Sequence, residues 1–305
     1  MNTIKTFVLM LVMSGLLLLA GFFLGGMTGI IIALVISLGI NFFAYWSSDK
    51  LALRMAHAYE VSPEDDRDLH QIVDEQAARA GIPKPKVYII KNDSPNAFAT
   101  GRNPNHAAIA VTTGIKRLLN REELGGVIAH ELAHVGNRDT LIMTTVATIA
   151  MAIGFIALIA RFSMFFGGFG GRGRGGGGGY GSIIGIVGLL VVAIVLPIVA
   201  TLVRLSISRA REYQADSTGA RTSGNPNALA DALEKLEMGS LRQPMRVSEG
   251  VAHLYIVNPL KGAPSEGDSS EERAPKSGGG FSKLFSSHPP IPERARRLRN
   301  MRTDW

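Results

Sequence analysis

The sequence predicts an α-helical integral membrane protein with an α+β domain on the cytoplasmic side of the bilayer. Hydrophobic residues make up 46% of the 305 positions, and four long runs are nearly uncharged. These runs occur in two pairs, which predicts four transmembrane helices in two hairpins. The polar stretches between and after the pairs contain short β-type runs and amphipathic helical patterns, which predict the α+β domain.

The first pair of apolar runs covers residues 4–24 and 30–45, with a glycine-rich turn at 25–29. A cleaved signal peptide is the alternative for the first run. That run is long, however, lacks a clear small-x-small cleavage site, and is followed at once by a second apolar run. Tyr45 and Trp46 stand where an interfacial aromatic pair is expected. We therefore predict an N-terminal transmembrane hairpin over residues 1–46.

Residues 47–140 have the patterns of a folded domain outside the bilayer. Residues 62–65 resemble a capped helix start, and a helical apolar face follows and ends at Gly81. Three short β-type runs cover 86–91, 96–100 and 107–112, separated by Pro, Gly and Asn. We expect these runs to form a small antiparallel sheet ahead of an apolar helix.

A second transmembrane hairpin is predicted over residues 141–203, with a kink at Pro197. The alternatives are partial immersion and a buried helical hairpin in a soluble domain. Its Gly-rich loop, 162–181, resembles RGG-type segments that bind RNA, but one short tract between two spans favours a flexible loop of unassigned role, and no nucleic-acid partner is expected. Residues 204–305 are predicted to be cytoplasmic, with a mobile linker at 261–280 and a C-terminal helix.

Charge around the apolar runs predicts the orientation. The net charge is +7, and the basic residues cluster beside the runs and at the C-terminus, which favours a membrane surface over nucleic acid. With the amino terminus inside, the inner side carries Lys5, Lys50, Arg54, Arg121, Arg138, Arg204, Arg209, Arg211 and Arg221, and the outer side carries Arg161, Arg172 and Arg174. This bias, although imperfect, places both polar regions in the cytoplasm.

The helix expected over residues 124–140 contains the motif His130-Glu131-Leu132-Ala133-His134. Residues four apart lie on one face of a helix, so both imidazoles can bind one Zn²⁺ ion, and Glu131 can act as a general base. Two histidines four apart by accident are the alternative. The surrounding helix is apolar nearly all round, however, and buried polar groups need a partner such as a metal. Because the chain has no cysteine, any metal must be held by His and carboxylate.

A third ligand is expected just after the second hairpin, where Glu212 and Asp216 lie four apart. If the helix of His134 continued into one span and the other span continued to Glu212, both positions would lie roughly 10–14 Å from the same membrane face. Glu212 would then complete a His₂Glu site, the ligand set that leaves a position for water. An exposed helix with Arg–Glu pairing is the alternative.

The sequence resembles the HtpX family of membrane-embedded zinc metalloproteases, which are related to the eukaryotic CAAX-processing membrane protease. The likeness covers nearly the whole chain. It is carried by Asn96-Ala97-Phe98-Ala99-Thr100-Gly101, by His130–His134, by Arg211-Glu212-Tyr213-Gln214-Ala215-Asp216, and by Ser287-His288-Pro289-Pro290 followed by Arg294.

The resemblance implies a cytoplasmic zincin-like α+β metalloprotease domain with one Zn²⁺ per chain. It implies that His130, His134 and Glu212 bind the zinc ion, that Glu131 is the catalytic acid/base, and that Asp216 orients a ligand histidine.

Two further roles are implied for the cleft. The segment Asn96, Ala97, Phe98 and Ala99 resembles the edge strand that receives an extended substrate, and His288 resembles an oxyanion stabiliser. The alternatives are that Asn96 is a turn residue after Pro95 and that His288 precedes a helix.

The family also implies an endopeptidase of the bacterial inner membrane that acts in quality control and stress response. Its substrates would be misfolded or damaged membrane proteins and unfolded polypeptides, cut on the cytoplasmic side; the oligomeric state is open. A scaffold or holdase that binds clients without cutting them is the rival, and the intact Glu131 and complete ligand set argue against it.

Overall fold

The computed structural model describes residues 2–145, 148, 209–245, 247, 252, 254–257, 259 and 289–302. Most of the second predicted hairpin, with its Gly-rich loop, and the whole 261–280 linker lie outside the described residues. The described elements are α1 (Asn2–Met55), β1 (Ala58–Glu60), α2 (Arg67–Ala80), β2 (Lys86–Ile90), β3 (Ala97–Gly101), β4 (Ala107–Thr112), α3 (Thr113–Leu118), α4 (Arg121–Gly136), α7 (Arg209–Ser223), α8 (Pro226–Arg242) and α11 (Ile291–Arg299).

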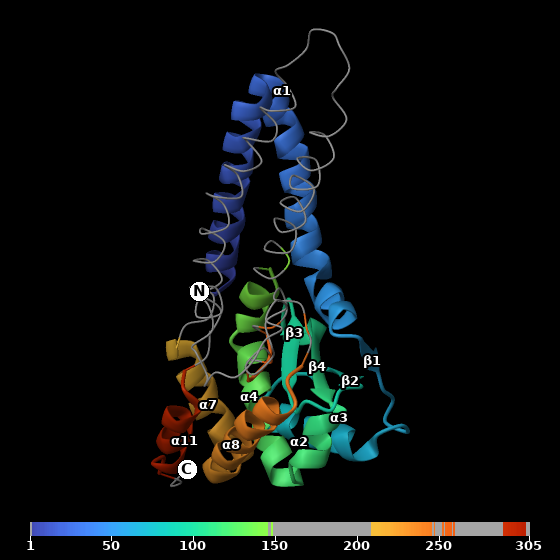
Figure 1. The fold of residues 1–305 in the computed structure, drawn as a ribbon, viewed down its shortest axis with the longest axis vertical. Helices are drawn as coiled ribbons and strands as arrows, with labels where there is room; N and C mark the ends of the chain where they lie inside the picture. The colour runs from blue at the N-terminus through green and yellow to red at the C-terminus, as the bar shows by residue number, and fades with distance from the viewer. Residues whose placement is uncertain are drawn as a thin grey trace, which may run out of the picture.

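Helix α1 reverses its direction and forms two arms that rise from one end of the α+β domain (Figure 1). The backbone turns at Gly26, whose φ of +56° suits glycine. The Ser37 hydroxyl lies 2.7 Å from that of Ser14, whereas a straight helix would separate them by about 35 Å. Asn41 also donates to the Ser14 hydroxyl at 2.7 Å. Residues 2–55 therefore form a helical hairpin whose arms share a polar cluster.

Within the described residues, one segment is both long and apolar enough to cross a membrane, Gly26–Ser47. The shorter segment Thr6–Leu19 in the other arm is also apolar. Many large apolar side chains of the hairpin are exposed, as expected of a lipid-facing surface. They include Ile31, Val35, Leu38 and Phe42. Of the four predicted spans, the described residues contain one of full length. Most of the second predicted hairpin lies outside them.

In the described part of the chain, the sheet has four strands in the order β1-β2-β4-β3. β1 pairs with β2 and β3 pairs with β4 in antiparallel fashion, but β2 and β4 are parallel. The expectation of a purely antiparallel sheet was therefore wrong. After β2, residues 91–96 carry the chain across two strand spacings of about 4.8 Å each to β3. Strand β4 then lies between β2 and β3. As a result β3 is an edge strand.

Two layers cover the sheet. On one face, α2 and α4 bury Val87, Ile89, Ala97, Ile109 and Val111 in the main core. On the other face, Phe98, Ala108 and Ala110 pack against Ala52, Leu53 and Ala56 at the end of α1 and against Leu254 and Tyr255. The last turns of the hairpin helix thus belong to the core of the domain, which fixes the hairpin relative to the sheet.

The boundaries of α2 follow local capping rules. The N-cap is Asp66, whose side chain accepts from Leu69 N, rather than a residue of 62–65. Ser62 and Asp65 instead hydrogen bond to each other in the turn before the helix. At the other end Gly81 adopts the left-handed conformation with φ of 66°, so the helix ends there as its glycine predicts.

Candidate metal centre

Helix α4 carries His130, Glu131 and His134 through the middle of the domain. Asn120 and Glu123 form a capping box that fixes its start. Every residue from Glu123 to Val135 is buried, because α2, α7, α8 and β3 pack around the helix. An apolar helix surface with three ionisable side chains at its centre is the arrangement expected of a built site.

The helix ends at Gly136 instead of continuing toward residue 141. Asn137 caps it, Arg138 takes the left-handed φ of 59°, and helical structure resumes at Asp139. The continuous helix considered for this junction is therefore contradicted. The break brings Asp139 to His134, because on a continuous helix Asp139, five positions further along, would point about 140° away from His134. Here the Asp139 carboxylate instead accepts a hydrogen bond from His134 Nδ1 at 3.2 Å.

Helix α7 brings Glu212 to the histidines because it packs on α4 backbone to backbone. The close contact is at Gly219, where a Cβ would lie 2.7 Å from His130 N and 2.8 Å from His130 Cα. Any larger residue would push α7 away from the motif helix. Glu212 and Asp216 lie two turns and one turn before this contact, so both carboxylates reach the imidazoles.

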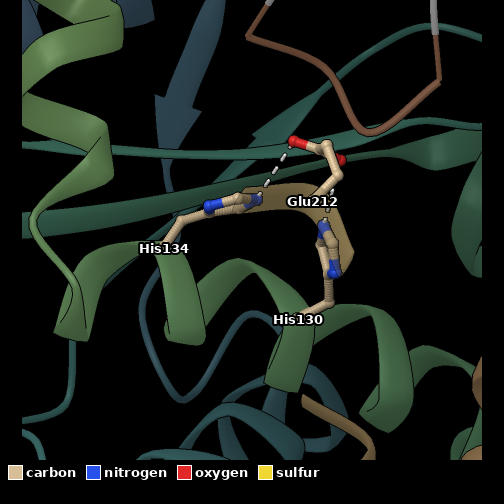
Figure 2. A group of neighbouring side chains, drawn as sticks. All are labelled: His130, His134 and Glu212. Atoms are coloured by element: carbon tan, nitrogen blue, oxygen red, sulfur yellow. Dashed lines mark ion pairs between the residues drawn. The ribbon is translucent and has the colours of Figure 1, made fainter. Parts of the chain in front are cut away.

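The three expected ligand residues converge (Figure 2). Both imidazoles rise from α4, and the Glu212 carboxylate reaches them from α7. Glu212 Oε1 lies 3.6 Å from His134 Nε2, and Oε2 lies 3.9 Å from His130 Nε2. Tetrahedral Zn²⁺ with bonds near 2.0–2.1 Å needs ligand atoms about 3.3 Å apart. All three ligand atoms lie within 4.8 Å of one another, so the donor set fits zinc once the side chains draw together around the ion.

A buried ion pair stands behind His130. Arg294 from α11 is fully buried and forms two hydrogen bonds to Asp216, at 2.8 and 2.7 Å. Asp216 Oδ1 in turn lies 3.0 Å from His130 Nδ1, and Arg294 Nη1 lies 3.5 Å from Glu212 Oε2. With their Nδ1 atoms turned toward carboxylates, both imidazoles direct Nε2 toward Glu212, the orientation that metal-binding histidines generally need.

The surroundings shift the pKa values of the two histidines in opposite directions. Burial lowers the pKa of His130, against the opposing effect of Asp216, so its imidazole is neutral and able to bind a metal. Burial also disfavours the charged form of His134, but the Asp139 hydrogen bond and the Glu212 carboxylate outweigh it and raise its pKa to about 9. The site thus holds a proton that a metal ion would displace.

Glu131 lies on the strand side of the histidines. Its Oε2 accepts a hydrogen bond of 2.8 Å from the backbone N of Ala99 in β3. Burial raises the pKa of Glu131 to about 7, against the lowering effects of His134 and the Ala99 hydrogen bond. A carboxylate with a pKa near neutrality can both accept and return a proton.

The residues predicted for the substrate cleft differ from one another in where they lie. Ala97, Phe98 and Ala99 form the edge strand beside Glu131. Asn96 is fully buried and bonds through its amide to Val257, donating to O at 2.8 Å and accepting from N at 3.3 Å. His288 lies outside the described residues.

Two residues of the site were not assigned from the sequence. Arg294 was named only in the motif that carries the family resemblance, but it lies three residues after Ile291 and four before Leu298, on the buried stripe of α11. That position was the available signal. For Asp139, the signal was the Gly136-Asn137 pair, which is typical of a helix end.

Known proteins are similar to this chain in sequence and in fold. Residues 63–302 match peptidase family M48. The chain is 48% identical over 301 residues to "Protease HtpX homolog" of Desulfatibacillum aliphaticivorans, which covers 99% of this chain and 90% of that protein. It is 48% identical over 297 residues to the homologue of Aquifex aeolicus (97% and 90%) and 46% identical over 300 residues to that of Pyrococcus furiosus (98% and 95%).

Among solved structures, the fold resembles the crystal structure of S. mikatae Ste24p, with a TM-score of 0.52 and 18% identity. The match covers 97% of this chain and 65% of that one, and at this identity it supports the fold alone. The family match, the HtpX relatives and the buried His-Glu-x-x-His helix agree. The chain belongs to peptidase family M48, as a membrane metalloprotease of the HtpX type.

Proposed function

We propose that the protein is a zinc-dependent endopeptidase in which His130, His134 and Glu212 hold one Zn²⁺ ion per chain. The convergence of these three buried side chains carries the proposal. Bound zinc supplies Lewis acidity, which polarises a peptide carbonyl and lowers the pKa of water to about 7. Every other chemical role falls to side chains of this chain.

Glu131 is the proton carrier of the proposed reaction. Its carboxylate accepts the proton of the attacking water and returns it to the leaving nitrogen of the cleaved peptide. The Ala99 N–H holds Oε2 toward the strand, and the buried surroundings keep the carboxylate away from bulk water. Position and pKa thus suit one group that acts first as base and then as acid.

Asp216, Arg294 and Asp139 position the ligands. Arg294 fixes Asp216 with a two-pronged hydrogen bond, and Asp216 then faces His130 Nδ1. Asp139 performs the same task for His134. Partners of this kind typically contribute about 10- to 100-fold in metal affinity or activity.

The edge strand β3 is the proposed substrate platform. Asn96 O accepts from Thr112 N in β4, so alternate residues from Asn96 bond to β4, whereas Ala97, Ala99 and Gly101 direct their backbone groups outward. An extended polypeptide could add to this edge as a strand beside Glu131. Because such recognition uses backbone groups, it suits unfolded segments of many sequences.

The relatives and the charge pattern support the proposed biological setting. Relatives named Protease HtpX homolog and the apolar hairpin support a role on membrane-protein or unfolded polypeptide substrates. The predicted positive-inside bias supports a site facing the cytoplasm in a bacterial inner membrane. We propose that the protein removes misfolded or damaged membrane proteins in a stress response.

The test is metal analysis combined with cleavage of casein and of a reconstituted membrane protein. Wild type should contain one zinc per chain and cut both substrates. Glu131→Gln should retain zinc and lose cleavage, because the amide keeps the shape but cannot accept the proton. Turnover at the wild-type rate in Glu131→Gln would refute the proposed mechanism.

A further inference from the structure

The edge of β3 is closed at its Ala97 end by another part of the chain. The backbone N of Ile256 donates to Ala97 O at 3.0 Å, which is the bond that an added strand would make. The side-chain amide of Asn96 bonds to the neighbouring Val257 twice: its Nδ2 donates to Val257 O, and its Oδ1 accepts from Val257 N. We refer to residues 254–257 as the wall segment.

The wall segment is part of the core. Leu254, Tyr255, Ile256 and Val257 are each at most 3% exposed. Tyr255 packs edge-on against Phe98 with ring centroids 5.0 Å apart, while Ile256 and Val257 belong to the core on the α4 side of the sheet. A segment buried in both cores is a fixed boundary rather than a strap that substrate displaces. Beyond the wall segment, Ala99 N already donates to Glu131 Oε2 at 2.8 Å, and Gly101 O accepts from the Thr140 hydroxyl at 2.9 Å. Substrate pairing along the described edge is therefore confined to Ala99 O and Gly101 N.

The other end of the edge lies at the level where the hairpin helix leaves its apolar segment. Arg102, next after β3, places its guanidinium carbon 4.6 Å from the Trp46 ring centroid. Trp46 stands one residue before the end of the candidate span Gly26–Ser47, and Trp and Arg are typical of the membrane interface. Three residues at about 3.3 Å each separate Ala99 from Arg102. With the Arg102 backbone taken as the bilayer level, the catalytic Glu131, bonded to Ala99, lies about 10 Å from that level.

We propose that this site selects its cleavage position by distance from the membrane, so that its substrate class is the unfolded stretch adjoining a membrane span. The inference rests on the proposed function and concerns where that activity is directed. A substrate helix beside the hairpin adds about 10 Å of lateral distance, giving a separation of about 14 Å. An extended chain covers this in about four residues, and a flexible one in about five to eight.

Tether length then ranks the possible cuts. The local concentration of a tethered segment is greatest when its length matches the separation and falls roughly as the −3/2 power beyond it. A bond 40 residues from the span should therefore be cut roughly tenfold less often than one seven residues away. Loosening the wall segment should spread the cuts away from the bilayer.

The experiment uses full-length enzyme and reporter proteins reconstituted in the same liposomes. Each reporter has, in order, one membrane span, a linker of 0, 5, 10 or 20 residues, a test sequence and a folded domain. The test sequence, here called the tile, is the same unfolded stretch of twelve residues in every reporter. Mass spectrometry locates the cuts. The proposal predicts that cuts stay about four to eight residues from the span and move from the tile into the linker as the linker grows. Cuts that follow the tile at every linker length would overturn it.

Asn96→Ala tests the wall segment, and Asn227→Ala, at an exposed position on α8, is its control. Asn96→Ala should shift the mean cut outward by several residues, whereas Asn227→Ala should match wild type. If Asn96→Ala folds and its cut pattern is unchanged, the wall segment does not limit substrate pairing. If Asn96→Ala does not fold, the reporter series with wild-type enzyme still tests the distance rule. Casein cleavage separates the two proposals: no casein cleavage refutes the protease function, whereas casein cleavage with tile-following cuts refutes the distance rule alone.

Discussion

Gly219→Ala should weaken zinc binding while leaving the fold intact. The added Cβ would lie 2.7 Å from His130 N and 2.8 Å from His130 Cα, whereas carbon contacts are comfortable only beyond about 3.5 Å. Both neighbours are backbone atoms, so α7 and α4 must separate by roughly 0.7 Å at that point. A metal site must hold its ligands to within about 0.5 Å, and Glu212 moves with α7.

The size of the effect can be worked out from overpacking. Inserting a methyl group into a close-packed contact costs about 1–3 kcal/mol. If the strain is relieved by moving Glu212 away, zinc affinity falls by about 5- to 150-fold. Alanine gains up to about 1 kcal/mol over glycine in a helix, so the free energy of unfolding should change little. Site and fold therefore respond differently to the same substitution.

Competition with a chelator of known zinc affinity, on detergent-solubilised protein, measures the first quantity, and thermal unfolding measures the second. Gly126→Ala is the matched control, because its Cβ would lie 3.2 Å from Leu229 Cα on α8, a helix that carries none of the three ligands. Zinc affinity of Gly219→Ala within twofold of wild type would refute the reasoning that the contact at Gly219 positions Glu212.

Three further outcomes are expected. Cleavage should decline as pH falls through the pKa of Glu131, with a midpoint at or below about 7 because nearby zinc favours the carboxylate; a rate that rises on acidification from pH 7 to 5 would contradict this. Arg294→Met should lower the unfolding free energy by about 3–5 kcal/mol, seen by thermal melts, because Asp216 stays buried without its partner; an unchanged melting temperature would contradict it. Cysteines placed at Lys50 and at Gly26 should label from opposite sides of the membrane, Lys50 from the cytoplasm; the chain has no native cysteine, so the reverse pattern would be unambiguous.

The site could be predicted from the sequence where its residues follow the period of a helix. His130, Glu131 and His134 keep the spacing that places them together on any helix. Glu212 was reached by counting residues along a presumed continuous helix, which the break at Arg138 contradicts. Its position depends instead on the backbone contact at Gly219, a tertiary feature that no local pattern encodes.

The order of the strands was beyond sequence reasoning. Short β-type runs separated by Pro, Gly and Asn predicted β2, β3 and β4, but such runs fit an antiparallel sheet and a sheet with one parallel pair equally well. Only the insertion of β4 between β2 and β3 makes β3 an edge strand. The role of Arg294 was missed for a related reason. This buried arginine pairs with the buried carboxylates of Asp216 and Glu212 on another helix, α7, and that pairing depends on the tertiary fold.

The central claim is that His130, His134 and Glu212 bind zinc, and zinc titration of Glu212→Gln beside Asp216→Asn tests it most directly. Glu212→Gln should bind zinc far more weakly than wild type, because an amide is a much poorer ligand than a carboxylate. Asp216→Asn should lose only about 10- to 100-fold, because its partner histidine can still bind. Full zinc affinity in Glu212→Gln, with loss of zinc in Asp216→Asn, would contradict the assignment.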